Sequence, residues 1–322
     1  MKLILPTAGK GTRLRPFSLY RSKSLLKVYS KPIIQHLMES IERWTNFDEI
    51  ILVISPDENG YKTYEFLKSI YPNTSYRIQE KTIGLADAVY VGINNIEEDV
   101  LIVLPDALYS GSFDFSENFI AVKEVEDPTR FGIVILDGNY VIDLEEKPEN
   151  PKTNLAISGI YYIKDTRNLE KSIKKLYEMN VKTKNEYQLT DALRIFIKEN
   201  KIRAIKIDEW YDCGKVETYL ETMLYILKKE GTNILSSSES STIVDPVFID
   251  KDCHIENSTI GPFVDISQNC IIKNSSIENS IIMENTIIEN SNIENSIIGS
   301  NCKIVNFSGE IILGDFGKLI SK

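Results

Sequence analysis

Short apolar runs alternate with longer amphipathic stretches over the first 230 residues of the chain. The runs LILP (3–6), EIILVIS (49–55) and VLIVLPD (100–106) are nearly continuous in apolar residues, which is typical of buried strands. The stretches between them have helical spacing and span 32–44, 61–71 and 84–96. This alternation predicts a parallel sheet covered by helices on both faces.

The later part of this region is richer in strands and predicts an antiparallel insertion into the sheet. Further strands are expected at 118–125, 131–137, 140–147, 156–163 and 202–208. Further helices are expected at 166–179, 188–199 and 215–229. We therefore expect residues 1–230 to form one mixed α/β domain.

The pattern changes after GTNILSSSESS (231–241), a stretch of small polar residues that we interpret as a linker. Over 242–322 isoleucine recurs in steps of five or six residues, and the tetrad IENS occurs four times. Neither a helix nor an amphipathic hairpin has that period, whereas a left-handed parallel β-helix of triangular section does. One aliphatic side chain per flat side would point inwards, with Asn and Ser at the corners. The expected inward residues are Ile249, Ile255, Ile260, Ile266, Ile272, Ile277, Ile282, Ile288, Ile293, Ile298 and Ile304.

Composition and charge exclude several classes of protein. The chain has 322 residues, of which 42% are hydrophobic and 26% charged, as in globular proteins of two domains. Its net charge of -10 argues against broad binding to nucleic acid or anionic membranes. The four cysteines are far apart and predict neither a zinc site nor a disulfide framework, which favours a cytoplasmic protein. No signal peptide or membrane-spanning run is indicated.

The first 38 residues differ from the rest, because they hold eight basic residues and no acidic one. They surround a glycine-containing loop after the first expected strand, PTAGKGTRLRP (6–16). Glycine lets a backbone approach a phosphate closely, and Arg and Lys neutralise its charge, so we prefer a polyphosphate site to a solvated basic face. The Walker motif is absent, and Leu14 replaces the third glycine of the dinucleotide fingerprint. Neither an ordinary P-loop NTPase nor an NAD enzyme is therefore indicated.

Eight motifs, in order along the chain, resemble those of the sugar-phosphate nucleotidyltransferases, most closely the glucose-1-phosphate thymidylyl- and uridylyltransferases. The motifs are AGKGTRLRP (8–16), SKSLLKV (22–28), LPDALYSG (104–111), RFGIV (130–134), LEEKP (144–148), ISGIY (157–161), EYQLTDAL (186–193) and WYDCG (210–214). The resemblance implies an α/β, Rossmann-like and GT-A-like domain, followed by the left-handed β-helix of the long thymidylyltransferases. It also implies Mg²⁺-dependent attack of glucose-1-phosphate on the α-phosphate of dTTP or UTP, with release of pyrophosphate.

The resemblance assigns the site residues one by one. Arg13 would clamp the β- and γ-phosphates, Lys23 would neutralise the α-phosphate or pyrophosphate, and Lys147 would bind the sugar phosphate. The implied nucleotide-binding residues are Thr7, Ala8, Gly9, Gly11, Thr12, Arg13, Gln79 and Gly84. Gln79 would read the edge of a pyrimidine base with its amide. The implied sugar-binding residues are Gly132, Glu146, Lys147, Gly159 and Trp210.

Asp106 and Asp212 are the implied Mg²⁺ ligands. Asp106 follows a buried apolar run and a proline, and open α/β sheets place ligands where their strands end. Two carboxylates suit Mg²⁺, which usually adds phosphate and water oxygens to one or two protein ligands. The alternative for Asp106 is an aspartate in a turn after proline.

Two other classes of function stay open. A β-helix acyltransferase fused to a nucleotidyltransferase would need a catalytic histidine, and the chain has only His36 and His254. A non-catalytic sensor or scaffold would usually lack one of the charged site residues, all of which are present. We therefore expect a nucleoside triphosphate and a sugar-1-phosphate as partners, with no nucleic acid or membrane. The β-helix is left for homo-oligomer assembly or for binding a regulator.

Overall fold

The computed structural model describes residues 1–9 and 11–321, so Lys10 of the glycine-containing loop and Lys322 lie outside the described residues. The described chain forms two compact units. The first, here called the sheet unit, comprises Met1–Gly9 and Leu37–Trp210. The second, here called the β-helix unit, comprises Lys10–His36 and Tyr211–Lys322. The sequence predicts one domain over residues 1–230. The two compact units are divided differently, because most of the basic N-terminal segment belongs to the unit that contains the β-helix.

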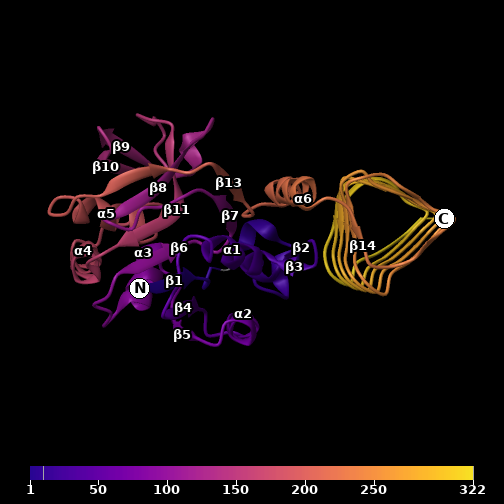
Figure 1. Cartoon of the computed structure of the whole chain (residues 1–322), viewed down its shortest axis with the longest axis horizontal. Coiled ribbons are helices and arrows are strands. Elements are labelled where there is room, and N and C mark those ends of the chain that lie inside the picture. The colour runs from indigo at the N-terminus through magenta and orange to yellow at the C-terminus, as the bar shows by residue number, and fades with distance from the viewer. Residues whose placement is uncertain (10, 322) are drawn as a thin grey trace. The chain divides into compact units, whose positions relative to one another are not determined.

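In the described part of the chain, the sheet unit is built on a nine-stranded mixed sheet of order β5-β4-β1-β6-β11-β8-β12-β10-β9 (Figure 1). Strands β5, β4, β1 and β6 are parallel, whereas β11 is antiparallel to both β6 and β8. The strands are β1 Lys2–Pro6, β4 Glu49–Ile54, β5 Thr74–Ile78, β6 Val100–Val103, β8 Phe119–Glu124, β9 Gly132–Asp137, β10 Tyr140–Glu146, β11 Leu155–Ile163 and β12 Arg203–Lys206. The predicted parallel sheet with an antiparallel insertion is confirmed.

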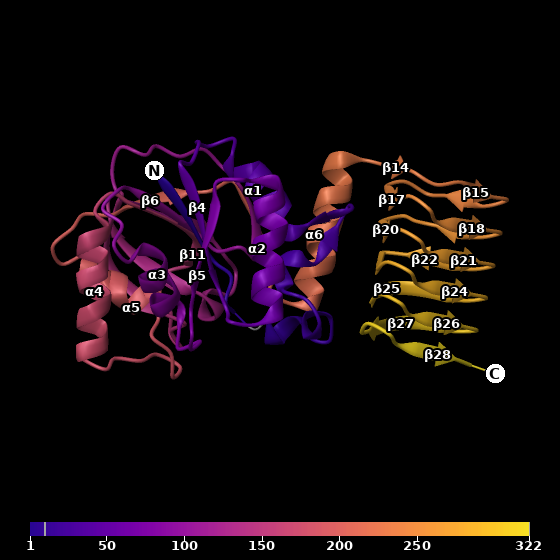
Figure 2. The same cartoon turned by 90° about the horizontal axis from the view of Figure 1, so that it is seen from below.

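Helices occur where the hydrophobic spacing predicts them. They are α1 Ile33–Ile41, α2 Glu58–Ile70, α3 Leu85–Ile93, α4 Thr166–Glu178, α5 Leu189–Phe196 and α6 Val216–Glu230. Helices α3, α4 and α5 pack on one another, and their apolar faces join those of the sheet strands in one buried cluster (Figure 2). Helix α2 begins earlier than its apolar spacing predicts, because the Asp57 carboxylate caps it by accepting the Gly60 N–H at 2.9 Å. No helix of the described residues is long and apolar enough to cross a membrane.

Several short strands escape the sequence pattern because they lack the continuous apolar run that marks strands such as β6. They include β2 Lys27–Val28, β3 Lys31–Pro32, β7 Ala107–Ser110 and β13 Glu209–Asp212, together with the edge strand β5. β2 and β3 form a hairpin whose two loop residues, Tyr29 and Ser30, have φ of 54° and 66°. Positive φ at both positions matches the twist of a tight hairpin, although Asn and Gly are the usual residues there.

The described part of the β-helix consists of short parallel strands stacked in three rows, seen end-on in Figure 1 and as successive coils in Figure 2. The strands are β14 Asn233–Ile234, β15 Ser238–Glu239, β16 Thr242–Ile243, β17 Val247–Ile249, β18 His254–Glu256, β19 Thr259–Ile260, β20 Val264–Ile266, β21 Ile271–Lys273, β22 Ser276–Glu278, β23 Ser280–Ile282, β24 Ile287–Glu289, β25 Asn292–Ile298, β26 Lys303–Val305, β27 Ser308–Leu313 and β28 Lys318–Ile320. Every isoleucine predicted to point inwards is at most 1% exposed, which confirms a parallel β-helix. Three buried cysteines, Cys253, Cys270 and Cys302, belong to the same interior cluster.

The polar stretch 231–241 is not a linker, contrary to its composition. It contains β14 and β15, which pair in parallel with β17 and β18, while β16 directly after it pairs with β19. These strands form the first coil of the β-helix. Ile234 and Ile243 lie in register with the inward Ile249 and Ile260, but Ser238 lies in register with Ile255. The isoleucine period is therefore interrupted in this coil, and the repeat does not reveal it.

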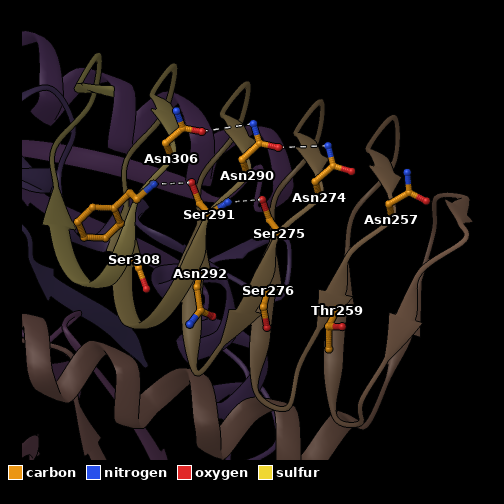
Figure 3. A pocket seen from close by; sticks show the side chains of 11 residues that line it. Asn257, Thr259, Asn274, Ser275, Ser276, Asn290, Ser291, Asn292, Asn306 and Ser308 are labelled. Carbon is orange, nitrogen blue, oxygen red and sulfur yellow. Dashed lines mark hydrogen bonds between the residues drawn. The ribbon is translucent and has the colours of Figure 1, made fainter. Parts of the chain in front are cut away.

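Asparagine and serine side chains stabilise the corners between the rows (Figure 3). Asn274, Asn290 and Asn306 have φ of 49°, 49° and 56°, a conformation that asparagine tolerates better than most residues. The Asn274 amide donates to Asn290 at 3.2 Å and the Asn290 amide to Asn306 at 3.4 Å. Beside them, the Ser275 hydroxyl accepts the Ser291 N–H at 3.1 Å. The groove of about 640 Å³ that these residues line is thus bordered by ladder hydrogen bonds, as the predicted corner role requires.

One row of the β-helix is buried on its outer side as well, and the covered residues there are apolar except for Asp265. Phe248, Ile281 and Ile297 occupy this side, and each is at most 1% exposed. Helix α6 packs against β23 and β25 of this row, and its Tyr219 donates a hydrogen bond to the Lys27 carbonyl. In the doubled isoleucines 281–282 and 297–298, the second residue fills the interior. The first residue lies on the outer side of the row, beneath the chain that covers it.

We expect Ile277→Ala to lower the free energy of unfolding by about 2–5 kcal/mol, because it leaves a cavity in the β-helix interior. Ile277 is 0% exposed, whereas Ile312 of the last coil is 53% exposed. The matched control Ile312→Ala should change stability by no more than about 0.5 kcal/mol. Urea unfolding followed by circular dichroism measures both, and equal losses would contradict the inward assignment of Ile277.

Candidate active site

The glycine-containing loop begins where β1 ends. Thr7 continues the pairing of β1 with β4, donating its backbone N–H at 2.8 Å and its hydroxyl at 2.9 Å to the Val53 carbonyl. Ala8 beside it is buried, which anchors the start of the loop on the sheet. Gly9 is exposed, and a Cβ there would meet nothing within 4 Å. Protein packing therefore does not require glycine at this position, and the Gly9 backbone is open to close approach by a ligand.

Residues 11–16 of the loop lie in the β-helix unit, where the chain folds back on itself. Gly11 has φ of 59° and precedes a 3₁₀ helix, Thr12–Leu14, in which Arg13 is exposed. The Ser18 hydroxyl donates to the Gly11 carbonyl at 2.7 Å. A Cβ on Gly11 would lie 3.3 Å from the Lys23 Cβ. The turn at Gly11 thus brings the backbone before Arg13 next to the side chain of Lys23.

Gln79 and Gly84 lie together at the start of α3. Gln79 is 2% exposed, and its Nε2 donates to the Gly84 carbonyl at 3.2 Å and to the Asp87 carboxylate at 2.8 Å. Both amide hydrogens are therefore used within the protein, and Oε1 is the atom with which Gln79 would meet a base. Gly84 has φ of 142°, and a Cβ there would lie 2.2 Å from the Tyr187 carbonyl oxygen. Packing alone explains this glycine.

Asp106 lies in the turn between β6 and β7, three residues beyond the end of β6. The turn is held by β11 at an irregularity of its pairing, where Gly159 accepts the Leu104 N–H at 2.9 Å. Gly159 has φ of 105°, and a Cβ there would lie 2.9 Å from both Leu104 and the Tyr109 hydroxyl. Glycine at 159 is therefore needed to bring β11 against the turn that carries Asp106. It contributes to the site through this packing.

Gly132, Glu146, Lys147 and Thr190 form a polar cluster at the meeting of β9, β10 and α5. The Glu146 carboxylate lies between two partners, Lys147 Nζ at 3.1 Å and the Thr190 hydroxyl at 2.7 Å. A Cβ on Gly132 would lie 2.8 Å from the Thr190 hydroxyl and 3.0 Å from Glu146. Burial, and then the charge of Glu146, raise the pKa of Tyr161, which keeps that phenol neutral. The structure thus joins three predicted sugar-binding residues around one carboxylate.

Trp210 belongs to the same part of the sheet unit. Its ring contacts that of Phe131 at 4.8 Å between centroids, and the Phe131 carbonyl accepts the Lys147 N–H at 3.0 Å. The indole N–H of Trp210 is buried and has no acceptor among the described residues. Leaving a buried donor unpaired costs about 1–3 kcal/mol, so a ligand oxygen would be favoured at this position.

Asp212 ends β13 in the β-helix unit. Its Oδ1 accepts the Gly214 N–H at 2.9 Å, and a Cβ on Gly214 would lie 2.7 Å from the same oxygen. The glycine of WYDCG thus makes room for the carboxylate and fixes its orientation. Cys213 between them is buried against the Thr222 hydroxyl at 3.2 Å and has a packing role.

Sequence reasoning missed two residues that support the site. Thr190 holds Glu146, and Asp87 holds both the Gln79 amide and, at 2.9 Å, the Tyr177 hydroxyl. Thr190 lies inside the motif EYQLTDAL, so its position in the motif is a usable signal. Asp87 follows Gly84 by three residues in the first turn of α3, and no sequence pattern distinguishes it from an ordinary helix-start aspartate.

The mixed sheet, the polar clusters at its strand ends and the β-helix together define a nucleotidyltransferase-like protein. The family model described as nucleotidyl transferase matches residues 2–229, and the one described as GMPPB C-terminal domain matches residues 243–315. The chain therefore belongs to the nucleotidyl transferase family, within the sugar-phosphate nucleotidyltransferases that its motifs resemble.

Named relatives and solved structures agree with this assignment. The chain is 34% identical over 253 residues to the bifunctional protein GlmU of Methanocaldococcus jannaschii, which covers 76% of this chain and 59% of that protein. It is 28% identical over 248 residues to a glucose-1-phosphate thymidylyltransferase of Neisseria meningitidis, covering 70% and 82%. A UDP-glucose pyrophosphorylase solved with UDP-glucose matches with TM-score 0.60 and 25% identity, covering 71% of this chain and 98% of that one. The chain thus spans about three fifths of the GlmU protein.

We expect Gly132→Ala to weaken binding of a sugar-1-phosphate by roughly tenfold or more, because small misplacements at a binding site are costly. The added methyl would press on Thr190 and Glu146, whereas Gly111→Ala would make only ordinary contacts of 3.5 Å or more. Calorimetric titration with glucose-1-phosphate measures both variants. If Gly132→Ala binds as tightly as Gly111→Ala, the cluster around Glu146 is not the sugar site.

Proposed function

We propose that this chain transfers a nucleotidyl group from dTTP or UTP to glucose-1-phosphate. A phosphate oxygen of the sugar attacks the α-phosphorus, the bond from that phosphorus to the β-phosphate oxygen breaks, and pyrophosphate leaves. The observation that carries the proposal is the cluster of Gly132, Glu146, Lys147 and Thr190, in a chain of the sugar-phosphate nucleotidyltransferase family. It offers a hydroxyl-binding carboxylate next to a phosphate-binding ammonium group.

Both substrates are anions, so the residues that bind them must offset strong repulsion. We assign Arg13 to the β- and γ-phosphates, together with backbone N–H groups of residues 8, 9, 11 and 12. Lys23 is assigned to the α-phosphate or the leaving pyrophosphate, and Lys147 to the sugar phosphate. The openness of the Gly9 backbone and the exposure of Arg13 support these roles.

Gln79 is the residue that we assign to the base. With both hydrogens of its amide held by Gly84 and Asp87, it presents an acceptor, Oε1. At the ring nitrogen of the pairing edge, uracil and thymine offer an N3–H donor to such an acceptor. Neutral cytosine has an acceptor at N3, and adenine has one at N1. Guanine also carries a ring N–H donor, so GTP is the most informative competitor in a substrate test.

The sugar is assigned to the sheet unit. Glu146 would accept hydrogen bonds from sugar hydroxyls, and the unpartnered Trp210 N–H would donate to a sugar oxygen. Gly132 leaves room beside Glu146, and Gly159 holds the neighbouring turn in place. A carboxylate acceptor and a nitrogen donor together suit a polyhydroxylated ring.

Mg²⁺ is the metal that we assign to Asp106 and Asp212. Their hard carboxylate oxygens fit this ion. In the part of the chain that the structure describes, no group of three or more His, Cys, Asp or Glu could hold a metal by itself. The ion would therefore need substrate oxygens as well, which is how Mg²⁺ usually binds. When bound, it would stabilise charge that develops on the phosphates.

We do not assign acyl transfer to the β-helix. His254 is its single histidine. That side chain is exposed and lies 3.4 Å from Glu256, which itself pairs with Lys273 at 3.0 Å. Among the described residues this is a surface charge cluster, and nothing in it requires an acyl donor.

The purified chain with Mg²⁺ and glucose-1-phosphate should release pyrophosphate from dTTP or UTP faster than from CTP or ATP, with GTP as the most informative competitor. The reason is the acceptor that Gln79 presents to the base. A coupled pyrophosphate assay with each nucleotide in turn measures the rates, and omission of the sugar phosphate is the control. Release from a purine nucleotide alone would overturn the proposed pyrimidine substrate, and release from ATP alone would also overturn the role of Gln79. If no nucleotide supports pyrophosphate release, either with glucose-1-phosphate or with a panel of other sugar-1-phosphates, the proposed function is overturned.

Asp106→Asn should lower turnover by roughly 100-fold or more while leaving the melting temperature unchanged, because a neutral amide is a far weaker Mg²⁺ ligand. The matched control Asp137→Asn alters an exposed aspartate at the end of β9 and should retain wild-type turnover. Pyrophosphate release and thermal melting check both variants. Full activity of Asp106→Asn would remove Asp106 from the metal site and favour the scaffold alternative.

A further inference from the structure

Residues 20–29, here called the docking strip, lie along the β-helix within the β-helix unit. At one end, Tyr20 contacts Phe316 of the last coil, with ring centroids 6.0 Å apart. At the other end, the Tyr29 ring contacts Phe248 at 4.4 Å, and the Tyr29 N–H donates to the Asp265 carboxylate at 2.6 Å. The strip therefore runs across the stack of coils from the last toward the first.

Arg21 makes the polar contacts between these ends. Its Nη2 donates to the Ser300 hydroxyl at 2.8 Å and to the Asp315 carboxylate at 2.9 Å, and its Nη1 donates to Glu284 at 3.3 Å. Asp315 also accepts the Ser300 N–H at 2.8 Å. Backbone hydrogen bonds between coils place Glu284, Ser300 and Asp315 one above another. One guanidinium group thus joins three successive coils.

This group is withdrawn from water, unlike most ion pairs of the chain. The Arg21 side chain is 20% exposed, that of Glu284 20% and that of Asp315 only 2%. Surface ion pairs contribute little, but breaking a buried one leaves an uncompensated charge and costs several kcal/mol. The planar fork of Arg suits several acceptors at once, which Lys cannot reproduce. Arg21 is therefore committed to the β-helix, although the sequence counts it among the basic residues next to the glycine-containing loop.

The docking strip contains Lys23 and directly follows the segment that carries Arg13, two of the groups that we assign to the triphosphate. Lys23 follows Arg21 by two residues, and its Cβ closes against Gly11. Ser18, which holds the Gly11 carbonyl, precedes Arg21 by three residues. Among the described residues, the turn that carries Arg13 is thus built on the chain that Arg21 fixes to the β-helix.

We propose that Arg21 is a positioning residue, through which the β-helix holds Arg13 and Lys23 in place for the nucleoside triphosphate. This inference rests on the proposed function and adds a role for the β-helix in the nucleotidyl transfer. It also makes the effect specific to one substrate, because the residues assigned to the sugar phosphate lie in the sheet unit, and none of them lies in segment 10–36.

The test compares Arg21→Met and Arg21→Lys with the control Arg194→Met, which breaks a pair of similar chemistry with Asp143 at 2.7 Å in the sheet unit. For Arg21→Met we expect the KM for the nucleotide to rise roughly tenfold or more, as for a misplaced binding group, with little change in the KM for glucose-1-phosphate. Arg21→Lys should be intermediate and Arg194→Met should resemble the wild type. Equal rises in both KM values, or none in either, would overturn the inference.

Arg21→Met leaves the partly buried carboxylates of Glu284 and Asp315 without their guanidinium partner and can therefore lower stability as a whole. The triple variant Arg21→Met, Glu284→Gln, Asp315→Asn removes these charges, so its melting temperature should recover while its nucleotide KM stays high. Hydrogen exchange of the amides of residues 11–19 in this variant should also become faster than in the wild type. Unchanged exchange would overturn the inference even if no nucleotide supports turnover, whereas faster exchange in an inactive protein would contradict only the proposed function.

Discussion

Repulsion among positive charges is the constraint on which the rest of this structure depends. Eight basic residues and no acidic one lie in the first 38 residues, and this segment would not fold compactly without compensation from elsewhere. The chain supplies that compensation from distant carboxylates. Lys2 pairs with Glu49 at 3.0 Å in the sheet unit, and Arg21 pairs with Glu284 and Asp315 in the β-helix unit. Part of the acidic excess behind the net charge of -10 thus serves to offset the charge of the basic N-terminal segment. Placing a carboxylate beneath this segment costs free energy when the carboxylate is buried. Asp265 accepts the Tyr29 N–H, and burial raises the pKa of its carboxyl to about 7.

The fold was largely predictable from the sequence because two clear periods dominate it. Buried strands such as Val100–Val103 and the isoleucine ladder of the β-helix each follow from the need to fill an interior with apolar side chains. The boundary between units was not predictable in this way. Segment 11–31 has no period of its own, and its place in the β-helix unit depends on contacts such as Arg21 with Asp315, across almost the whole length of the chain. The first coil was missed for another reason, because Ser238 interrupts the isoleucine ladder there.

The sequence proposed the residues of the candidate site, but it did not indicate the packing and hydrogen bonds that hold each of them. Glu146 and Lys147 were identified by their motif, and the structure places them in one cluster with Gly132. Gly84 was assigned to the base, yet its positive φ and the nearby Tyr187 carbonyl require glycine without any ligand. Thr190 and Asp87 are invisible to residue-type arguments, because each acts by holding another side chain. Thr190 lies in a motif that marks its position, but the supporting role of either residue becomes evident only when hydrogen-bond partners distant in sequence are known.

The docking strip also has a consequence for how this protein can change in length during evolution. A solenoid can grow or shrink by whole repeats, since each coil contacts only its neighbours. Here Tyr20, Arg21 and Tyr29 contact coils from Phe248 to Phe316. Duplicating a coil within that span would move the partners of Arg21 by one strand spacing, about 4.8 Å, and no side chain could follow. The docking strip therefore fixes the number of coils between Phe248 and Phe316, and repeats can be gained or lost only in coils that it does not contact.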